Sequence, residues 1–180
     1  MATPNNLPTI KRFITTHDPS GKAIFSDTIS EDNHFRDIPG ASFGLGYTTK
    51  GFPVDLNGDK DIEAYNAHLQ TPPGIVVSNG TVLRFVDVAP GSDSPMHRTV
   101  SLDYGVVLEG EIELVLDSGE TRRMKRGDVA IQRGTMHQWR NVGTGWARFM
   151  FVLQDSQPVV IDGKALGEDY GTMQGVPEST

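Results

Sequence analysis

The sequence contains no cysteine, and this absence removes several kinds of chemistry at once. Disulfide bonds, zinc–thiolate sites, iron–sulfur clusters and cysteine nucleophiles are all excluded. A metal ion would have to be bound by His, Asp or Glu. The chain has only five histidines: His17, His34, His68, His97 and His137. Any metal or acid–base site therefore depends on few side chains.

Long apolar runs and a basic charge balance are also missing. No segment has the roughly 18 consecutive apolar residues that a membrane-spanning helix needs. The stretch Met1–Pro8 has no basic segment followed by apolar residues, so we expect no secretory signal and a cytoplasmic location. The formal net charge of −7 argues against nucleic acid and an anionic membrane surface as partners, because both attract basic faces.

The first 80 residues are irregular and rich in turn signals. Two short runs, Lys22–Phe25 and Ser42–Tyr47, predict strands. The stretch Asp59–Leu69 predicts a brief helix with Asp59 as its N-cap. We therefore expect residues 1–80 to form an N-terminal arm of loops and first strands that packs on the main body.

Residues 81–157 differ, because short runs rich in β-branched and aromatic residues follow one another between turn signals. This pattern is typical of an all-β sandwich or barrel with little helix. Residues 158–180 carry scattered Gly and Pro, and we expect a C-terminal tail over the outside. A chain of 180 residues fits one structural domain. The predicted strands are Thr81–Val88, Tyr104–Leu108, Glu111–Leu116, Val129–Gln132, His137–Asn141 and Ala147–Leu153.

Two stretches of this region carry recognisable motifs. Gly91–Gly110 has the spacing of the first cupin motif, with His97 and Asp103 at two of its ligand positions. Gly127–Asn141 resembles the second motif, in which a Gly-Asp turn, a strand and a Gly turn lead to His137. The chain thus resembles the single-domain cupin proteins of fungal polyketide gene clusters, several of which are described as cupin-domain oxidoreductases. The resemblance implies a small β-barrel of jelly-roll type, often paired as a homodimer through the N-terminal segment.

Three polar side chains are expected in the barrel mouth, and the resemblance implies that they remain from a metal-ligand set: His97, Asp103 and His137. Two histidines and one carboxylate match the facial triad that holds non-haem iron(II), so a divalent metal (Fe, Mn, Zn or Ni) is one alternative. However, Thr99 replaces the second histidine of the motif and Asp103 replaces a glutamate. The other alternative is metal-free acid–base chemistry, in which one imidazole removes a proton, its partner donates one and Asp103 orients an imidazole.

Five further side chains are predicted to contact a substrate. Arg84 sits within an apolar strand, where an inward guanidinium would clamp a carboxylate or enolate oxygen, although an outward, solvated arginine is equally compatible. Trp139 follows His137 by two residues and is expected on the same strand face, as a pocket wall or a core aromatic. The remaining candidates are Thr99, Tyr104 and Gln132. Asp103 itself has a structural alternative as a turn residue before the Tyr104 strand.

The leading functional hypothesis is a small enzyme that acts on a polyketide-derived intermediate by dehydration or a related proton transfer. The alternatives are an iron- or manganese-dependent oxidoreductase and a non-catalytic small-molecule-binding barrel. No nucleotide-binding fingerprint is present, so a nicotinamide or flavin cofactor is not expected.

Overall fold

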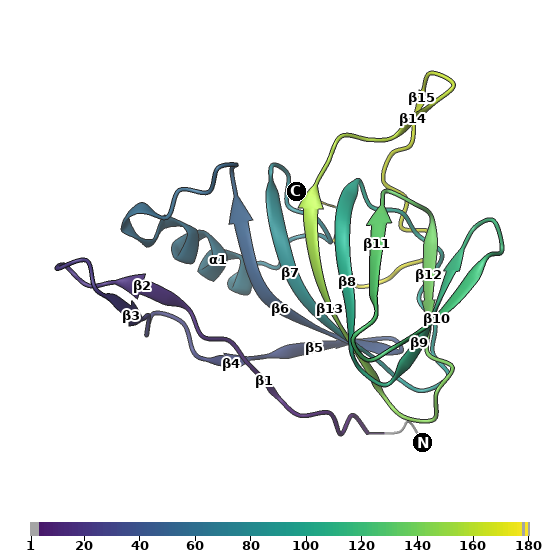
Figure 1. The fold of residues 1–180 in the computed structure, drawn as a ribbon, viewed down its shortest axis with the longest axis horizontal. Helices are drawn as coiled ribbons and strands as arrows, with labels where there is room; N and C mark the ends of the chain where they lie inside the picture. Colours follow the sequence, from purple (N-terminus) through teal and green to yellow (C-terminus); the bar gives the residue numbers. More distant parts are fainter. Residues whose placement is uncertain (1–3, 178, 180) are drawn as a thin grey trace.

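The computed structural model describes residues 4–177 and 179 and shows a β-barrel with one short helix at its side (Figure 1). Most residues outside loops belong to antiparallel strands. The elements in chain order are β1 (Ile10–Lys11), β2 (Thr15–His17), β3 (Ala23–Phe25), β4 (Asp32–Asn33), β5 (Phe35–Ile38), β6 (Ala41–Lys50), the 3-10 turn η1 (Asn57–Asp59), α1 (Lys60–Gln70), β7 (Gly80–Val88), β8 (Ser101–Glu109), β9 (Glu111–Leu116), β10 (Thr121–Lys125), β11 (Val129–Arg133), β12 (His137–Arg140), β13 (Ala147–Asp155), β14 (Val160–Ile161) and β15 (Lys164–Ala165).

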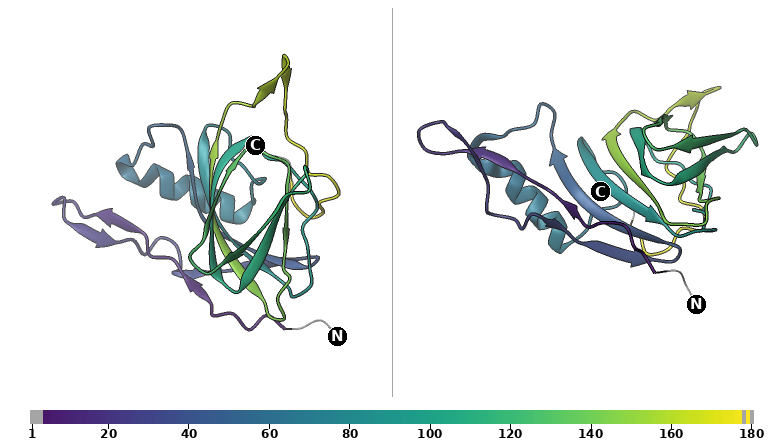
Figure 2. Two further views of the ribbon diagram at one scale, coloured as in Figure 1. Left: turned by 45° about the vertical axis from the view of Figure 1, so that its right-hand side comes forward. Right: turned by 60° about the horizontal axis from the view of Figure 1, so that its bottom comes forward.

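Two sheets form the walls of the barrel, as the turned views show (Figure 2). The larger sheet has the strand order β11-β8-β13-β7-β6-β5, and the smaller has the order β10-β9-β12. The segment 92–98 lies antiparallel beside β12, because the backbone groups of His97 and His137 exchange two hydrogen bonds of 2.9 Å. This extra segment widens the smaller wall and carries one of the predicted site histidines into it.

Along each strand of the larger sheet, side chains that face the barrel interior alternate with side chains that face outward. On β7, for example, Val82, Arg84 and Val86 face the barrel interior, whereas Asp87 lies on the outer face next to Arg148 of β13. The inner face packs into a core with residues of the smaller sheet. Residues that alternate inward on this sheet therefore reach either the core or an internal cavity.

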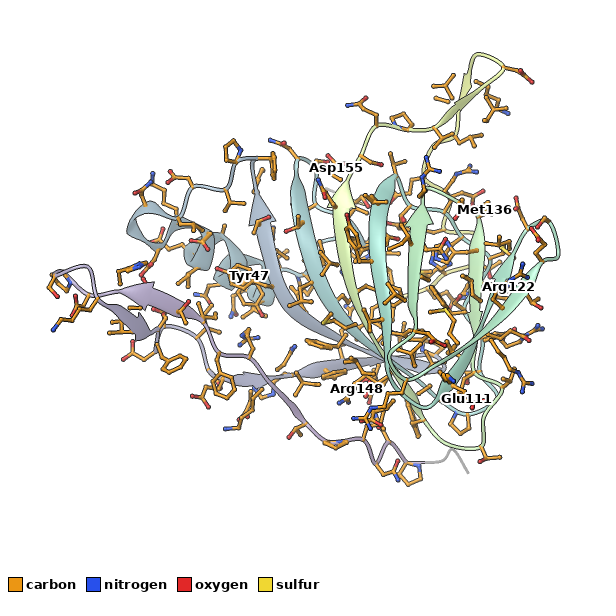
Figure 3. The ribbon with its side chains drawn as sticks, in the orientation of Figure 1. Tyr47, Glu111, Arg122, Met136, Arg148 and Asp155 are labelled. Carbon is orange, nitrogen blue, oxygen red and sulfur yellow. The ribbon has the colours of Figure 1, made fainter. Side chains whose placement is uncertain are left out.

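The helix α1 covers the outer face of β6 (Figure 1). The Tyr65 hydroxyl of α1 donates to the Leu45 carbonyl at 2.7 Å. Tyr47 of β6, labelled in Figure 3, donates to Asp61 at 2.7 Å. The expected N-cap is wrong in its detail: Asp59 precedes α1, but its backbone is left-handed (φ 55°) and its side chain accepts from Thr16 instead of capping the helix.

The predicted all-β barrel is confirmed, and every strand predicted within 81–157 is present, with ends that match or are shifted by up to three residues. The strand β10 was not predicted, because Thr121–Lys125 has one apolar side chain among polar ones and its outer positions are exposed. No helix in the described part of the chain is long and apolar enough to cross a membrane.

Candidate functional site

A cavity of about 390 Å³ lies inside the barrel and is bounded by both sheets. Strand residues form most of its wall, and segments from the N-terminal arm and the C-terminal tail complete it. Apolar and aromatic side chains dominate, with a few polar groups among them, which is the usual composition of a small-molecule site. Its lining residues include Phe43, Ile75, Arg84, Val86, His97, Thr99, Asp103, His137, Trp139, Phe149, Phe151, Leu153 and Met173.

The two predicted histidines meet in this cavity. His97 and His137 are direct cross-strand partners, so both side chains point to the same face of the smaller wall. Their ring centroids are 4.3 Å apart with an angle of 47° between the planes, and both residues are buried. The convergence predicted from the two motifs is therefore present.

The hydrogen bonds of the two rings fix their tautomers. His97 Nδ1 lies 2.8 Å from the Pro95 carbonyl, and His137 Nδ1 lies 2.9 Å from the Thr135 carbonyl. A carbonyl only accepts, so each Nδ1 carries the proton and each Nε2 is left with a free lone pair. The backbone thus orients both imidazoles, a role that the sequence had assigned to Asp103.

Burial makes the charged form of both rings unfavourable. Burial lowers the pKa of His97, opposed by the hydrogen bond to Pro95. Burial and then the neighbouring charge of His97 lower the pKa of His137 to about 3. Both imidazoles are therefore neutral at pH 7, and protonation of one ring opposes protonation of the other.

Asp103 lies within β8 and points inward, so the alternative of an exposed turn residue is wrong. Its carboxylate accepts hydrogen bonds from Ser101 Oγ at 2.5 Å and from Thr99 Oγ1 at 3.5 Å. Burial raises the pKa of Asp103 to about 6, although these two hydrogen bonds lower it. The carboxyl group is therefore able to exist in either protonation state near neutral pH.

The predicted metal-ligand set is not assembled. No group of three or more His, Asp or Glu side chains in residues 4–177 and 179 is arranged to hold a metal ion. The Asp103 carboxylate instead accepts hydrogen bonds from Ser101 at the start of β8 and from Thr99 just before it. With Thr99 at the position of the motif's second histidine, the side chains in direct contact are two imidazoles, and two imidazoles alone do not form a facial triad.

Arg84 reaches the cavity from the larger sheet, which resolves the open question of its direction: it faces inward. Its side chain is buried, with 8% of its surface exposed, and Nη2 donates to the Gly74 carbonyl at 2.8 Å. The Phe43 ring lies 5.4 Å from the centre of the guanidinium. Burial lowers the pKa of Arg84 to about 10, so the group is still a cation at pH 7.

The other predicted contacts divide into two groups. Trp139 and Thr99 line the cavity, and the Trp139 ring meets His137 edge to face at 5.7 Å between centroids. Tyr104 is 43% exposed on the outer face of β8, so its prediction as a substrate contact is wrong. Gln132 is buried behind the cavity wall, where its Oε1 accepts from Thr135 Oγ1 at 2.6 Å, and it does not line the cavity.

Sequence reasoning missed two contributions to the site. Ser101 holds the Asp103 carboxylate, and the period-two spacing of Thr99, Ser101 and Asp103 was the signal that placed them on one face. The tail residues Thr172–Gln174 line the cavity instead of packing on the outside. Backbone pairing between Arg98 and Asp169 holds this tail against the barrel, and no local sequence pattern predicts such a contact.

The barrel, its inward-facing histidine pair and the internal cavity define a protein of the cupin class. The family described as the cupin domain matches residues 84–153. Relatives that cover most of the chain agree with this match, and the chain belongs to the cupin family.

The relatives place the chain among cupins of fungal biosynthetic clusters, as the motifs indicated. Phomopsin biosynthesis cluster protein D of Diaporthe leptostromiformis is 55% identical over 89% of this chain and 86% of its own length. Oryzines biosynthesis cluster protein J of Aspergillus oryzae is 44% identical over 94% of this chain and 96% of its own. The cupin-domain-containing oxidoreductase fogC of Aspergillus ruber is 45% identical over 93% of this chain and 83% of its own.

A solved structure supports the fold over nearly the whole chain. The polyketide cyclase RemF from Streptomyces resistomycificus matches with a TM-score of 0.50 and 19% identity, and the match covers 86% of this chain and 90% of that one. At this identity, the similarity is evidence for the jelly-roll architecture only.

Proposed function

We propose that this protein is a small enzyme of secondary metabolism that dehydrates a β-hydroxy carbonyl intermediate or catalyses a related proton transfer. The observation that carries the proposal is the pair of free Nε2 lone pairs on His97 and His137, held side by side in an apolar cavity. The names of the relatives support a role in a biosynthetic cluster. The expected substrate is a polyketide-derived small molecule.

The proton balance of the reaction follows from the pKa directions. His97 is the base that accepts the proton from the carbon next to the carbonyl. Burial lowers the pKa of both imidazoles, but the charge of His97 lowers the pKa of His137 further, so His137 is the weaker base. The electrons of the broken C–H bond form the C=C bond as the β C–O bond breaks. The leaving hydroxyl takes a proton from the Asp103 carboxylic acid, whose raised pKa keeps part of it protonated, and departs as water. Proton return from His97 to Asp103 through water then closes the cycle.

The apolar walls contribute to this chemistry by excluding water. Phe149, Phe151 and Leu153 line the same cavity as the histidine pair. A low-dielectric site strengthens the interactions of a developing enolate with fixed donors. The Trp139 ring beside His137 restricts the position of that imidazole. These contacts place the histidine pair at the wall of a mainly apolar pocket.

A second candidate function is that of an oxidoreductase. Its support is the name of fogC and of three further relatives at 40–46% identity, which are called cupin-domain-containing oxidoreductases. Iron or manganese bound in the cavity would supply the activation of dioxygen. The described residues, however, include no group of three ligands of the kind that such a metal prefers. A non-catalytic binding protein is a third candidate, which measurable turnover would exclude.

The test is a dehydration assay under anaerobic conditions, with a panel of β-hydroxy ketones and β-hydroxy acids followed by mass spectrometry. We expect a product lighter by one water from the chelator-treated protein. His97→Gln should lower the rate about 10²- to 10⁴-fold, the range for loss of a general base. His17→Gln, on an exposed strand of the arm, is the matched control and should retain the wild-type rate.

Two results would reject the proposal. Equal rates for wild type and His97→Gln would show that the imidazole takes no part in the reaction. Oxygen consumption that stops on treatment with a chelator and returns with added iron or manganese would favour the oxidoreductase instead.

A further inference from the structure

Arg84 is buried and forms no ion pair with any residue that the structure describes. The ion pairs among the described residues do not include Arg84, and the acids that line the same cavity, Asp93 and Asp103, are not within salt-bridge distance of it. One of its five N–H groups donates to the Gly74 carbonyl. Its Nε is fully buried and has no hydrogen-bond partner in the described part of the chain.

This arrangement is costly unless an anion completes it. A buried cation without a counter-ion loses its hydration and gains little in return, and proteins normally pair such groups. The remaining donors of a guanidinium form a planar fork that matches a carboxylate with two parallel hydrogen bonds. Because Arg84 lines the cavity, an anion bound there would replace the hydration that the guanidinium loses on burial.

The guanidinium is also held in place before any ligand arrives. Phe43 lies over the guanidinium with its ring 5.4 Å away, and the Gly74 carbonyl fixes one edge. A side chain that is already immobilised loses little conformational entropy on binding. These contacts favour a specific ligand site over an arginine that only fills space.

We propose that the cavity binds an organic monocarboxylate, with its carboxylate on Arg84 and its apolar body against Ile75, Val86 and Met173. A permanent carboxylate suits this site better than the transient enolate of the reaction, because the cation is buried at all times. The cavity volume of about 390 Å³ limits the ligand to a small molecule. Carboxylate binding by Arg84 does not depend on the proposed reaction. Only the identification of the bound acid as the substrate rests on the proposed function.

The reacting part of such an acid would lie toward the opposite wall. Arg84 belongs to the larger sheet and the histidine pair to the smaller one, and all three line the same cavity. A carboxylate on the larger sheet would therefore direct the rest of the molecule toward His97 and His137. In this arrangement Arg84 selects and orients the ligand, and the imidazoles carry out the proton transfer.

Calorimetric titration at neutral pH tests the proposal. The probes are 3-phenylpropanoate and the straight-chain acids from butanoate to decanoate, each paired with its neutral amide. We expect the wild type to bind at least one acid about 10- to 100-fold more tightly than its amide, the range for hydrogen bonds to a charged group. Arg84→Gln should lose this preference, Arg84→Lys should keep part of it, and Arg133→Gln on the exposed edge of β11 should keep all of it.

Three outcomes would overturn the proposal: equal binding of acid and amide by the wild type, an undiminished acid preference in Arg84→Gln, or no binding of any acid. Circular dichroism of each variant checks its fold, and Arg84→Lys tests the charge if Arg84→Gln is unfolded. His97→Gln separates the two proposals. If this variant keeps the acid preference but the wild type dehydrates nothing, the carboxylate site stands and the reaction fails. If His97→Gln loses turnover while Arg84→Gln still prefers acids, the reaction stands and the carboxylate site fails.

Discussion

Two arginines on neighbouring strands of the larger sheet, Arg84 and Arg148, are buried to a similar extent but on opposite faces, with 8% and 4% of their surfaces exposed. Arg148 forms two parallel hydrogen bonds with the Asp87 carboxylate, at 2.5 and 2.6 Å. The guanidinium of Arg84 has one hydrogen-bond partner among the described residues, the Gly74 carbonyl. The buried arginine on the outer face is thus paired with a carboxylate, whereas the buried arginine that faces the cavity has no carboxylate partner among the described residues.

The paired arginine also fastens the N-terminal arm to the barrel. Arg148 Nη1 donates to the Pro8 carbonyl at 2.6 Å, and Asn5 donates to Asp87 at 2.7 Å. The Phe35 ring of β5 lies 5.1 Å from the guanidinium of Arg148. Arg148 lies at the end of the barrel nearest the N-terminal segment (Figure 3). Its hydrogen bonds are therefore structural.

The largest expected effect comes from breaking the outer pair. Asp87→Asn leaves the buried Arg148 without its counter-charge, and we expect a loss of about 3–5 kcal/mol in the free energy of unfolding. Urea denaturation followed by circular dichroism measures this loss. Arg84→Met removes a cation that has no counter-ion, so its stability should stay within about 1 kcal/mol of the wild type. A loss in Arg84→Met as large as that in Asp87→Asn would show that Arg84 is paired after all.

The second prediction concerns the other buried charge of the cavity, Asp103. Its pKa is raised from 3.8 to about 6 in the folded protein, so the fold binds this proton more tightly than the unfolded chain does. The contribution of Asp103 to wild-type stability should therefore be lost as the pH rises from about 4 to 6, and Asp103→Asn should lack this loss. The stability of Asp103→Asn relative to the wild type should rise by up to about 3 kcal/mol between about pH 4 and pH 7.

The measurement is a urea denaturation series across this pH range with both proteins. The lowered pKa values of His97 and His137 act in the opposite direction, since they remove stability as the pH falls below their unfolded value of 6.5. Because both proteins retain these histidines, their contribution cancels in the difference. A stability difference that does not change with pH would mean that Asp103 is as easily ionised inside the cavity as in water.

The same contrast between faces explains how much of the molecule the sequence predicts. Alternation and motif spacing suffice for the barrel strands and for the convergence of His97 and His137. Strand register does not follow from spacing, so the direct cross-strand pairing of the two rings was unforeseen. Tyr104 is an error that alternation could have prevented, because a residue next to the inward Asp103 must face outward. The tail at Thr172–Gln174 reaches the cavity through long-range pairing, which leaves no periodic signal.

A third arginine gives the smallest effect and completes the comparison, because it is paired but not buried. Arg140 of β12 donates from Nε and Nη2 to Glu113 of β9, its cross-strand partner, at 2.9 and 2.5 Å. Its side chain is 44% exposed, so water hydrates the charge with or without the pair. Arg140→Met should therefore change the free energy of unfolding by less than about 1 kcal/mol, and this change should shrink further in about 1 M salt, where screening acts over about 3 Å.

Denaturation of Arg140→Met and Asp87→Asn at low and high salt measures both effects. If Arg140→Met were as damaging as Asp87→Asn, burial would not be what separates the two pairs, and the argument that an unpaired, buried Arg84 requires an anion would lose its physical basis.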